Sequence, residues 1–305
     1  MRDNEYERAG HGRRRRFDDD EPHFLKRLPH LEPQPTGEDD PETGDRWSTW
    51  DLSTAGERGP KPYPDWVVTE LAAVDTELGI VKTGKEADVH LVRRGVPGTD
   101  RECLMAAKRY RSSEHRMFHR DAGYLEGRRV RESRTNRAMA NRTGFGREMI
   151  AGQWAAAEFA ALYQLWEAGI QLGVRVVPYP VQILGTELLL EFLGTGDGQA
   201  APRLAQLRPE PRELADLWRQ TVDGLVVLAR CQIVHGDLSA YNILVDGGRL
   251  VLIDLPQVVD VVSNPHGREF LARDVRNVAT WFAARGMDID VDELIRDLLK
   301  EAGMR

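Results

Sequence analysis

The chain has 305 residues, of which 41% are hydrophobic and 30% charged, and its formal net charge is −7. This composition is close to that of ordinary folded proteins, and the length allows one large domain or two small ones plus a tail. No apolar run approaches the roughly 20 residues that span a bilayer, and the first residues lack the apolar core of a signal peptide, so we expect no membrane partner. Cys103 and Cys231 have no neighbouring cysteine, which favours buried free thiols and a cytoplasmic location.

Residues 1–65 predict a disordered, charged tail. A basic block at 13–16 is followed by an acidic block at 18–21, and Pro, Gly, Asp and Glu dominate as far as Pro64. Such a segment buries too little apolar surface to offset its ordering entropy. Trp47, Trp50 and Trp66 are exceptions that could dock on a folded domain. We therefore expect a tail over 1–65 and a folded domain over 66–305.

Residues 78–92 predict two strands joined by a turn. Gly79 and Gly84-Lys85 match part of a phosphate-binding Walker A motif, but Glu86 stands where that motif needs Ser or Thr. The alternation after Glu86 also predicts a strand, whereas a Walker A motif opens a helix. The better interpretation is a turn that covers phosphates, made by Thr83, Gly84, Lys85 and Glu86.

A third strand, 103–110, contains Ala107-Lys108, and the phosphate-covering turn about 20 residues upstream makes this lysine a candidate to hold nucleotide phosphates. Its ammonium needs a carboxylate partner. A helix is predicted over 151–168, and three glutamates are candidates. Glu148 precedes the helix and Glu167 is near its far end, so we choose Glu158.

The segment 111–147 between strand and helix carries ten arginines against four acidic residues, a net charge of +6 in a chain of −7. Loops of this length are usually functional or disordered. We expect a flexible basic loop. It is either a contact for RNA, an acidic protein or nucleotide phosphate, or a plain mobile connection.

The second half predicts two hairpins and three helices. Residues 180–193 indicate a pair of strands ending in a hinge, and a helix follows over 213–230. Two apolar runs, 242–245 and 250–253, flank Asp246-Gly-Gly and predict a hairpin with a primed turn. This hairpin brings together Asp237, Asn242 and Asp254, whose oxygens suit Mg²⁺. Two closing helices are expected over 268–285 and 291–300.

The order His235-Gly236-Asp237-Leu-Ser-Ala-Tyr-Asn242, followed by Asp254-Leu-Pro-Gln257, resembles the RIO family of atypical protein kinases. Small-molecule kinases of the aminoglycoside and choline type share the HGDL sequence and a later Asn, and are the nearest alternative. Only 51 residues follow Asp254. That length leaves no room for the activation loop and large helical lobe of a conventional kinase, and favours the shorter RIO architecture.

This resemblance implies an α+β fold, a truncated, bilobal kinase-like structure with an antiparallel sheet plus a helix in the N-lobe (about 66–192) and a small helical C-lobe (about 193–305). It implies that Asp237 orients or deprotonates the acceptor hydroxyl and that Asn242 and Asp254 hold the metal. The remaining residues of the implied nucleotide site are Thr83, Gly84, Lys85, Glu86, Val89, Lys108, Glu158, Glu191 and Leu193, with adenine held by the Glu191 carbonyl and the Leu193 amide.

The function that we expect is phosphoryl transfer from ATP with Mg²⁺, or Mn²⁺ in its place, by a serine/threonine protein kinase. The resemblance also implies an ATPase switch in which Asp254 is transiently phosphorylated. The expected partners are a protein substrate or the chain itself, with RNA or a ribosomal subunit as a candidate partner of the basic loop. Two alternatives stay open: a small-molecule phosphotransferase, and a nucleotide-gated RNA-binding scaffold.

Overall fold

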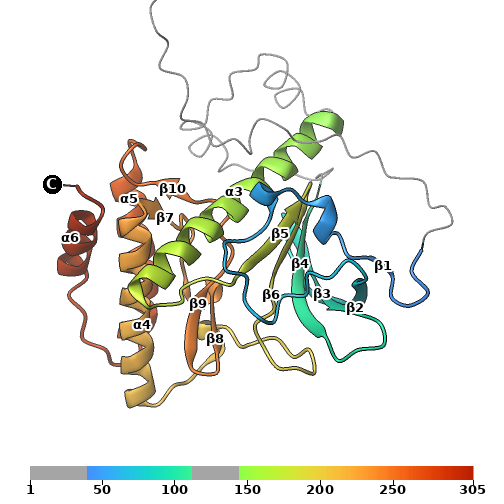
Figure 1. The fold of residues 1–305 in the computed structure, drawn as a ribbon. Helices are drawn as coiled ribbons and strands as arrows, with labels where there is room; N and C mark the ends of the chain where they lie inside the picture. Colours follow the sequence, from blue (N-terminus) through green and yellow to red (C-terminus); the bar gives the residue numbers. More distant parts are fainter. Residues whose placement is uncertain (1–39, 112–143, 305) are drawn as a thin grey trace, which may run out of the picture.

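Alternating apolar residues in the first half of the chain form a six-stranded antiparallel sheet with the order β1-β2-β3-β4-β6-β5. The protein is described by a computed structural model that covers residues 40–111 and 144–304. Figure 1 shows the sheet as one lobe and a group of helices as the other. The strands are β1 (Arg46–Trp47), β2 (Val74–Thr83), β3 (Ala87–Gly95), β4 (Glu102–Tyr110), β5 (Pro180–Leu184) and β6 (Glu187–Glu191). The strands and turns predicted at 78–92, 103–110 and 180–193 are thereby confirmed.

Both faces of the sheet are covered, because successive residues of a strand point to opposite sides. On the outer face, Met105 and Ala107 of β4 pack with Val181 and Leu189. On the inner face, Tyr110 joins the core that extends into the helical lobe. The inner face therefore looks toward the rest of the molecule, and a functional side chain placed there can meet residues of the helical lobe.

The outer face is covered by the segment before β2, which includes short 3-10 helices at Trp50–Leu52 and Ala55–Glu57. Trp50 is 4% exposed, and the Gly59 amide donates to the Val181 carbonyl at 3.0 Å. The prediction that the tail extends to residue 65 is wrong for this part, because its tryptophan and backbone amides find partners on the sheet. Residues 1–39 lie outside the described part of the chain.

Helix α3 (Gly144–Leu172) contacts both the sheet and the helical lobe, and Figure 1 shows it running diagonally between them. The predicted start at Ala151 is wrong, since the helix begins seven residues earlier. Ala151 is buried and packs on the core, and adding turns to an existing helix costs little compared with starting one. The predicted basic loop therefore ends before Gly144, and its residues 112–143 lie outside the described part.

The helical lobe consists of α4 (Pro211–Arg230), α5 (Gly267–Ala283) and α6 (Val291–Glu301), which confirms the three predicted helices. Two small sheets complete this lobe: β7 (Ile233–Val234) pairs with β10 (Val259–Asp260), and β8 (Ile243–Asp246) pairs with β9 (Arg249–Leu252). It also contains two 3-10 helices, at Leu204–Gln206 and Ala240–Asn242. Among the described residues, no helix has the length and apolarity needed to cross a membrane. Both cysteines are free, but only Cys103 is buried; full burial was the wrong expectation for Cys231, which is half-buried.

Candidate active site

The β8–β9 hairpin places the three predicted oxygen-bearing residues close together. Its turn has positive φ angles at both Gly247 (57°) and Gly248 (81°), as a type I′ turn requires. Asp246 pairs with Arg249 across this turn, so the predicted hairpin and its primed turn are confirmed. At the other end of the hairpin, the Ile253 amide donates to the Asn242 carbonyl at 3.0 Å. The residues next to this bond, Asn242 and Asp254, therefore enter and leave the hairpin side by side.

The buried side chain of His235 joins the segment before the hairpin to the segment after it. Its Nε2 lies 3.0 Å from the Ile253 carbonyl, and its Nδ1 accepts from the Asp237 amide at 3.4 Å. These two contacts hold the ring between the two segments. In addition, the Asn242 side-chain amide donates to the Asp237 carbonyl at 2.8 Å. The amide nitrogen is thereby used to fix the loop, which leaves the Asn242 side-chain oxygen as the atom able to bind a cation.

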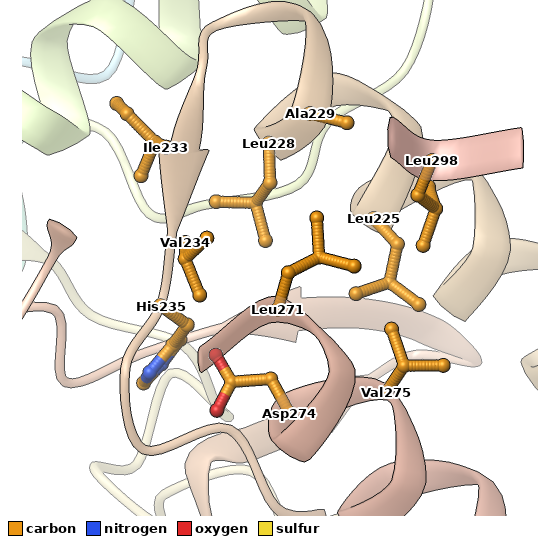
Figure 2. Close-up of a pocket in the computed structure, with 10 residues that line it drawn as sticks. All are labelled: Leu225, Leu228, Ala229, Ile233, Val234, His235, Leu271, Asp274, Val275 and Leu298. Carbon is orange, nitrogen blue, oxygen red and sulfur yellow. The ribbon is translucent and has the colours of Figure 1, made fainter. Parts of the chain in front are cut away.

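Helix α5 holds the same loop through the buried side chain of Asp274, which is 2% exposed. Its carboxylate accepts from the Gly236 amide at 2.7 Å and from the Leu238 amide at 3.1 Å, so it grips the backbone on both sides of Asp237. Burial raises the pKa of Asp274, although His235 and the two amides act to lower it. Figure 2 shows the carboxylate and the His235 ring side by side, with the apolar side chains above them and to their right.

The sequence reasoning did not identify Asp274. The feature that could have identified it is a carboxylate within the apolar stripe of a helix, between Leu271 and Val275 and followed by Val278. The cavity beside it is lined mostly by leucine, isoleucine and valine side chains and measures about 10 Å³. This is about the space of one water molecule, so the region is a packed part of the core that supports the loop and is too small to bind a ligand.

Lys108 connects three elements at the centre of the site. Its Nζ lies 2.8 Å from Oε1 of Glu158 on α3 and 2.7 Å from Oδ1 of Asp254 after β9. Burial acts to lower the pKa of Lys108, but the two carboxylates outweigh burial and raise it to about 12. The ion pair that we predicted with Glu158 is present. Glu167 is exposed, and the side chain of Glu148 lies outside the described residues.

Glu158 is itself buried, with 1% of its surface exposed, and its carboxylate has three donors. Besides Lys108, these are the Tyr110 hydroxyl and the Leu255 amide, the latter at 2.9 Å. The Leu255 bond ties α3 directly to the residue that follows Asp254. A single carboxylate therefore fixes the lysine and the segment that carries Asp254 with respect to each other.

Asp254 has φ +69°, which is uncommon for a residue other than glycine and costs on the order of 1–3 kcal/mol. Burial acts to raise the pKa of Asp254, but the charge and hydrogen bond of Lys108, assisted by Lys82 and His235, hold it below its usual value. The residue is therefore a carboxylate turned toward the site. A backbone in this conformation persists only where its surroundings hold it, here through Ile253 and Leu255.

The Asp254 carboxylate and the Asn242 amide oxygen fit the ligand preference of Mg²⁺, which commonly binds through one or two protein oxygens together with substrate phosphates and waters. Within 40–111 and 144–304, the structure contains no cluster of three or more His, Cys, Asp or Glu side chains suited to a metal. The donor set thus fits a nucleotide-associated cation rather than an ion held by protein alone.

The turn between β2 and β3 lies next to the segment that follows Asp254. The Gly84 amide donates to the Ala87 carbonyl at 3.0 Å, and a Cβ added at Gly84 would lie only 2.7 Å from that oxygen, so the tight turn requires glycine. Glu86 Oε1 lies 3.5 Å from Gln257 Nε2, which places the turn next to the segment that follows Asp254. Thr83 and Lys85 are exposed on the same turn.

The predicted hinge joins β6 to the helical lobe. Glu191 is the last residue of β6, and its carboxylate contacts Arg175 and accepts from the Tyr179 amide at 3.1 Å. Leu193 is buried with Ala201, Val251 and the half-buried Leu244. Val89, half-buried, lies opposite Lys108 on the inner face of the sheet. All the predicted nucleotide-site residues thus belong to the turn, the inner face, the hinge or the ion-pair centre. Sequence reasoning also missed Arg175, which holds the hinge glutamate.

Comparison with known proteins matches residues 98–294 to the family model described as RIO domain. The chain is 34% identical over 231 residues to the RIO-type serine/threonine-protein kinase Rio1 of Haloferax volcanii, covering 75% of this chain and 71% of that protein. It is 30% identical over 236 residues to the serine/threonine-protein kinase RIO1 of Saccharomyces cerevisiae, covering 71% and 46%. The serine/threonine-protein kinase RIO3 of Mus musculus is 35% identical over 147 residues, covering 47% and 27%.

Proposed function

The chain belongs to the RIO domain family of serine/threonine-protein kinases, and we propose that it transfers the terminal phosphoryl group of Mg-ATP to a hydroxyl group of a protein or of itself. The observation that carries this proposal is the ion-paired Lys108, held between Glu158 and Asp254 at 2.8 and 2.7 Å. Phosphoryl transfer depends mainly on positioning and charge neutralisation, and this arrangement supplies a fixed cation beside a carboxylate.

Each residue has a separate task in this proposal. Lys108, fixed by Glu158, holds nucleotide phosphate, and the Gly84 turn covers it. Asp237 is exposed, and its backbone is held by Asn242 and His235, so it can orient an acceptor hydroxyl that arrives from solvent. Asn242 and Asp254 would hold Mg²⁺, which when bound neutralises charge on the phosphate oxygens. The hinge at Glu191 and Leu193 would hold adenine through its backbone.

The family resemblance also supports a second acceptor, the carboxylate of Asp254. In that step a carboxylate oxygen forms a bond to the terminal phosphorus, the bond from that phosphorus to the bridging oxygen breaks, and ADP leaves. Attack of water on the phosphorus would then release phosphate and restore the carboxylate. We propose this ATPase cycle as an activity of the same site.

The relatives do not favour the two alternative functions, a small-molecule phosphotransferase and a scaffold without turnover. For a partner beyond the protein substrate, we propose RNA or a ribosomal subunit, bound through the arginine-rich segment. The support is its net charge of +6 over 111–147, most of which lies outside the described residues. The free cysteines support a cytoplasmic location.

The proposal is tested with γ-labelled ATP, separating phosphoprotein, hydroxylamine-sensitive acyl phosphate and free phosphate. Asp237→Ala should lower kcat by about 100-fold or more, the scale of general-base and positioning effects, and leave ATP affinity nearly unchanged. Lys108→Ala should weaken ATP binding as well as the rate. Asp216→Ala, on the exposed side of α4, is the matched control. Equal losses of ATP binding in the first two variants, with no separate effect on rate, would show that the roles are wrong.

A further inference from the structure

Strand β2 carries a lysine on the same face of the sheet as Lys108. Lys82 lies directly opposite Val89 of β3, and Val89 lies directly opposite Lys108 of β4. Residues that face each other across antiparallel strands point to the same side of the sheet. Lys82, Val89 and Lys108 therefore form one row on the inner face, and the two lysine backbones are two strand spacings apart, about 9–10 Å.

This placement depends on an irregularity in β2. The pairing shifts between Ile80 and Lys82, so that Ile80 lies opposite His90 while Lys82 lies opposite Val89. Without the shift, Lys82 and Ile80 would share a face, because they are two residues apart. The bulge turns the lysine to the inner side at the point where the strand enters the Gly84 turn, and bulges often serve to redirect a side chain in this way.

The charges around Lys82 come from both lobes. Partial desolvation lowers the pKa of Lys82, the positive charges of Arg203 and Lys108 lower it further, and Asp254 acts to raise it. Arg203 in turn donates to the Tyr241 carbonyl, next to the metal-site residue Asn242. Lys82 thus lies at the end of the site where Asp254 and Asn242 are, and both Lys82 and Lys108 act on the charge of the Asp254 carboxylate.

Lys82 gives this end of the site a second lysine beside Lys108, and an added cation of this kind suits a polyanion. Two lysine backbones 9–10 Å apart, each with a long side chain, can place their ammonium groups on different phosphates of one nucleotide. Glu158 is already satisfied by Lys108, Tyr110 and Leu255, so it does not neutralise Lys82. Metal-binding residues lie with the terminal phosphates in phosphoryl-transfer sites, and Lys82 is on their side.

We propose that Lys82 is a second phosphate-binding cation of this site, that it contacts the terminal phosphate, and that it makes the site prefer nucleoside triphosphate over diphosphate. This inference rests on the proposed function, since it concerns the same nucleotide site. Lys108 then binds the inner phosphates, and the two lysines divide the charge of the triphosphate between β4 and β2.

The test measures the affinity of the full-length protein for ATP, ADP and AMP with Mg²⁺ by isothermal titration calorimetry. Lys82→Ala should weaken ATP binding by about tenfold or more, the scale of one hydrogen bond to a charged group. ADP affinity should fall by about threefold at most, as expected for a residual long-range charge effect, and AMP affinity should not change. Lys82→Arg should keep the preference. Lys61→Ala, which removes the same charge over the Tyr63 ring, should behave like the unaltered protein.

Lys82 is exposed, so its replacement should leave the fold intact, and the thermal midpoint of unfolding verifies this. If Lys82→Ala weakens binding of ATP, ADP and AMP by the same factor, or of none of them, the inference is wrong while the proposed function stands. If the unaltered protein does not bind ATP, both are wrong. A preference for ATP that disappears in Lys82→Ala and persists in Lys82→Arg supports the assignment.

Discussion

Replacing Glu158 by glutamine tests whether the buried charge on α3 organises the site. Glutamine has the same shape, and its amide oxygen can still accept from Lys108 Nζ and the Leu255 amide, both of which bind Oε1. Its amide nitrogen can donate to the Tyr110 hydroxyl, which then reverses its own role as donor. The hydrogen-bond geometry therefore survives, and the change removes mainly the negative charge.

The expected loss of stability follows from burial of the ion pair. Lys108 is 8% exposed and Glu158 1% exposed, and removing one partner of a buried pair typically costs about 3–5 kcal/mol. Here Asp254 remains as a second counter-charge at 2.7 Å, and the hydrogen bonds are retained, so we expect about half of that cost, about 2 kcal/mol. For a domain of this size, such a loss lowers Tm by about 4–8 °C.

The measurement is chemical denaturation followed by tryptophan fluorescence, with thermal unfolding as a second readout. Glu167→Gln is the matched control, since it makes the same replacement at an exposed position of the same helix. Its free energy of unfolding should change by less than about 0.5 kcal/mol. A double-mutant cycle with Lys108→Met should give a coupling energy of about 1 kcal/mol or more between the two residues.

If Glu158→Gln loses no more stability than Glu167→Gln, the buried ion pair does not stabilise the folded chain as we argue. Strict additivity with Lys108→Met would lead to the same conclusion. In the variant Lys108 should pair more tightly with Asp254. Because this pairing occupies the carboxylate that we propose as a metal ligand, ATP binding should also weaken.

Two further changes address the metal segment and the loop before it. Asp254→Asn keeps the shape of the side chain but removes the charge of the proposed metal ligand and the proposed phosphoryl acceptor. It should therefore reduce Mg²⁺-dependent turnover by about 100-fold or more and abolish any acyl phosphate. Near-normal turnover in a Mg²⁺ titration would remove Asp254 from the site. Asp274→Ala should leave the Gly236 and Leu238 amides without their acceptor, at about 1–3 kcal/mol each. It should lower kcat more than ATP affinity, since the Asp274 carboxylate accepts from two amides of the loop that carries Asp237. A fall confined to ATP affinity would contradict this reasoning.

Local sequence determined the centre of the site. The hairpin from Ile243 to Leu252 pairs residues that are near in sequence, and its Gly247-Gly248 turn can be predicted from the positive φ angles that glycine tolerates. Asp237, Asn242 and Asp254 are brought close by this one short element, so their proximity follows from spacing alone. The same holds for the turn at Gly84 and the strand after it, where alternation predicts β3 without help from the rest of the fold.

For contacts between residues far apart in the chain, the sequence reduced the number of candidate partners but did not show the full contact. Lys108 and Glu158 are 50 residues apart, and helical placement selected Glu158 from three candidates, but the simultaneous pairing with Asp254 appears only when β4, α3 and the end of β9 meet. The cover of the outer sheet face was missed for the same reason. A charged, proline-rich composition indicates disorder, yet the burial of Trp50 depends on a sheet surface formed by later residues.

Tertiary structure alone decided which side chains support or extend the site. Asp274 looked like one more residue of an amphipathic helix, and its function depends on two backbone amides more than 30 residues away. For Lys82, simple alternation puts it on the same face as Ile80, whereas the bulge in β2 moves it to the face of Lys108. A single inserted residue reverses the direction of every side chain after it, and only the pairing of β2 with β3 shows where that insertion lies.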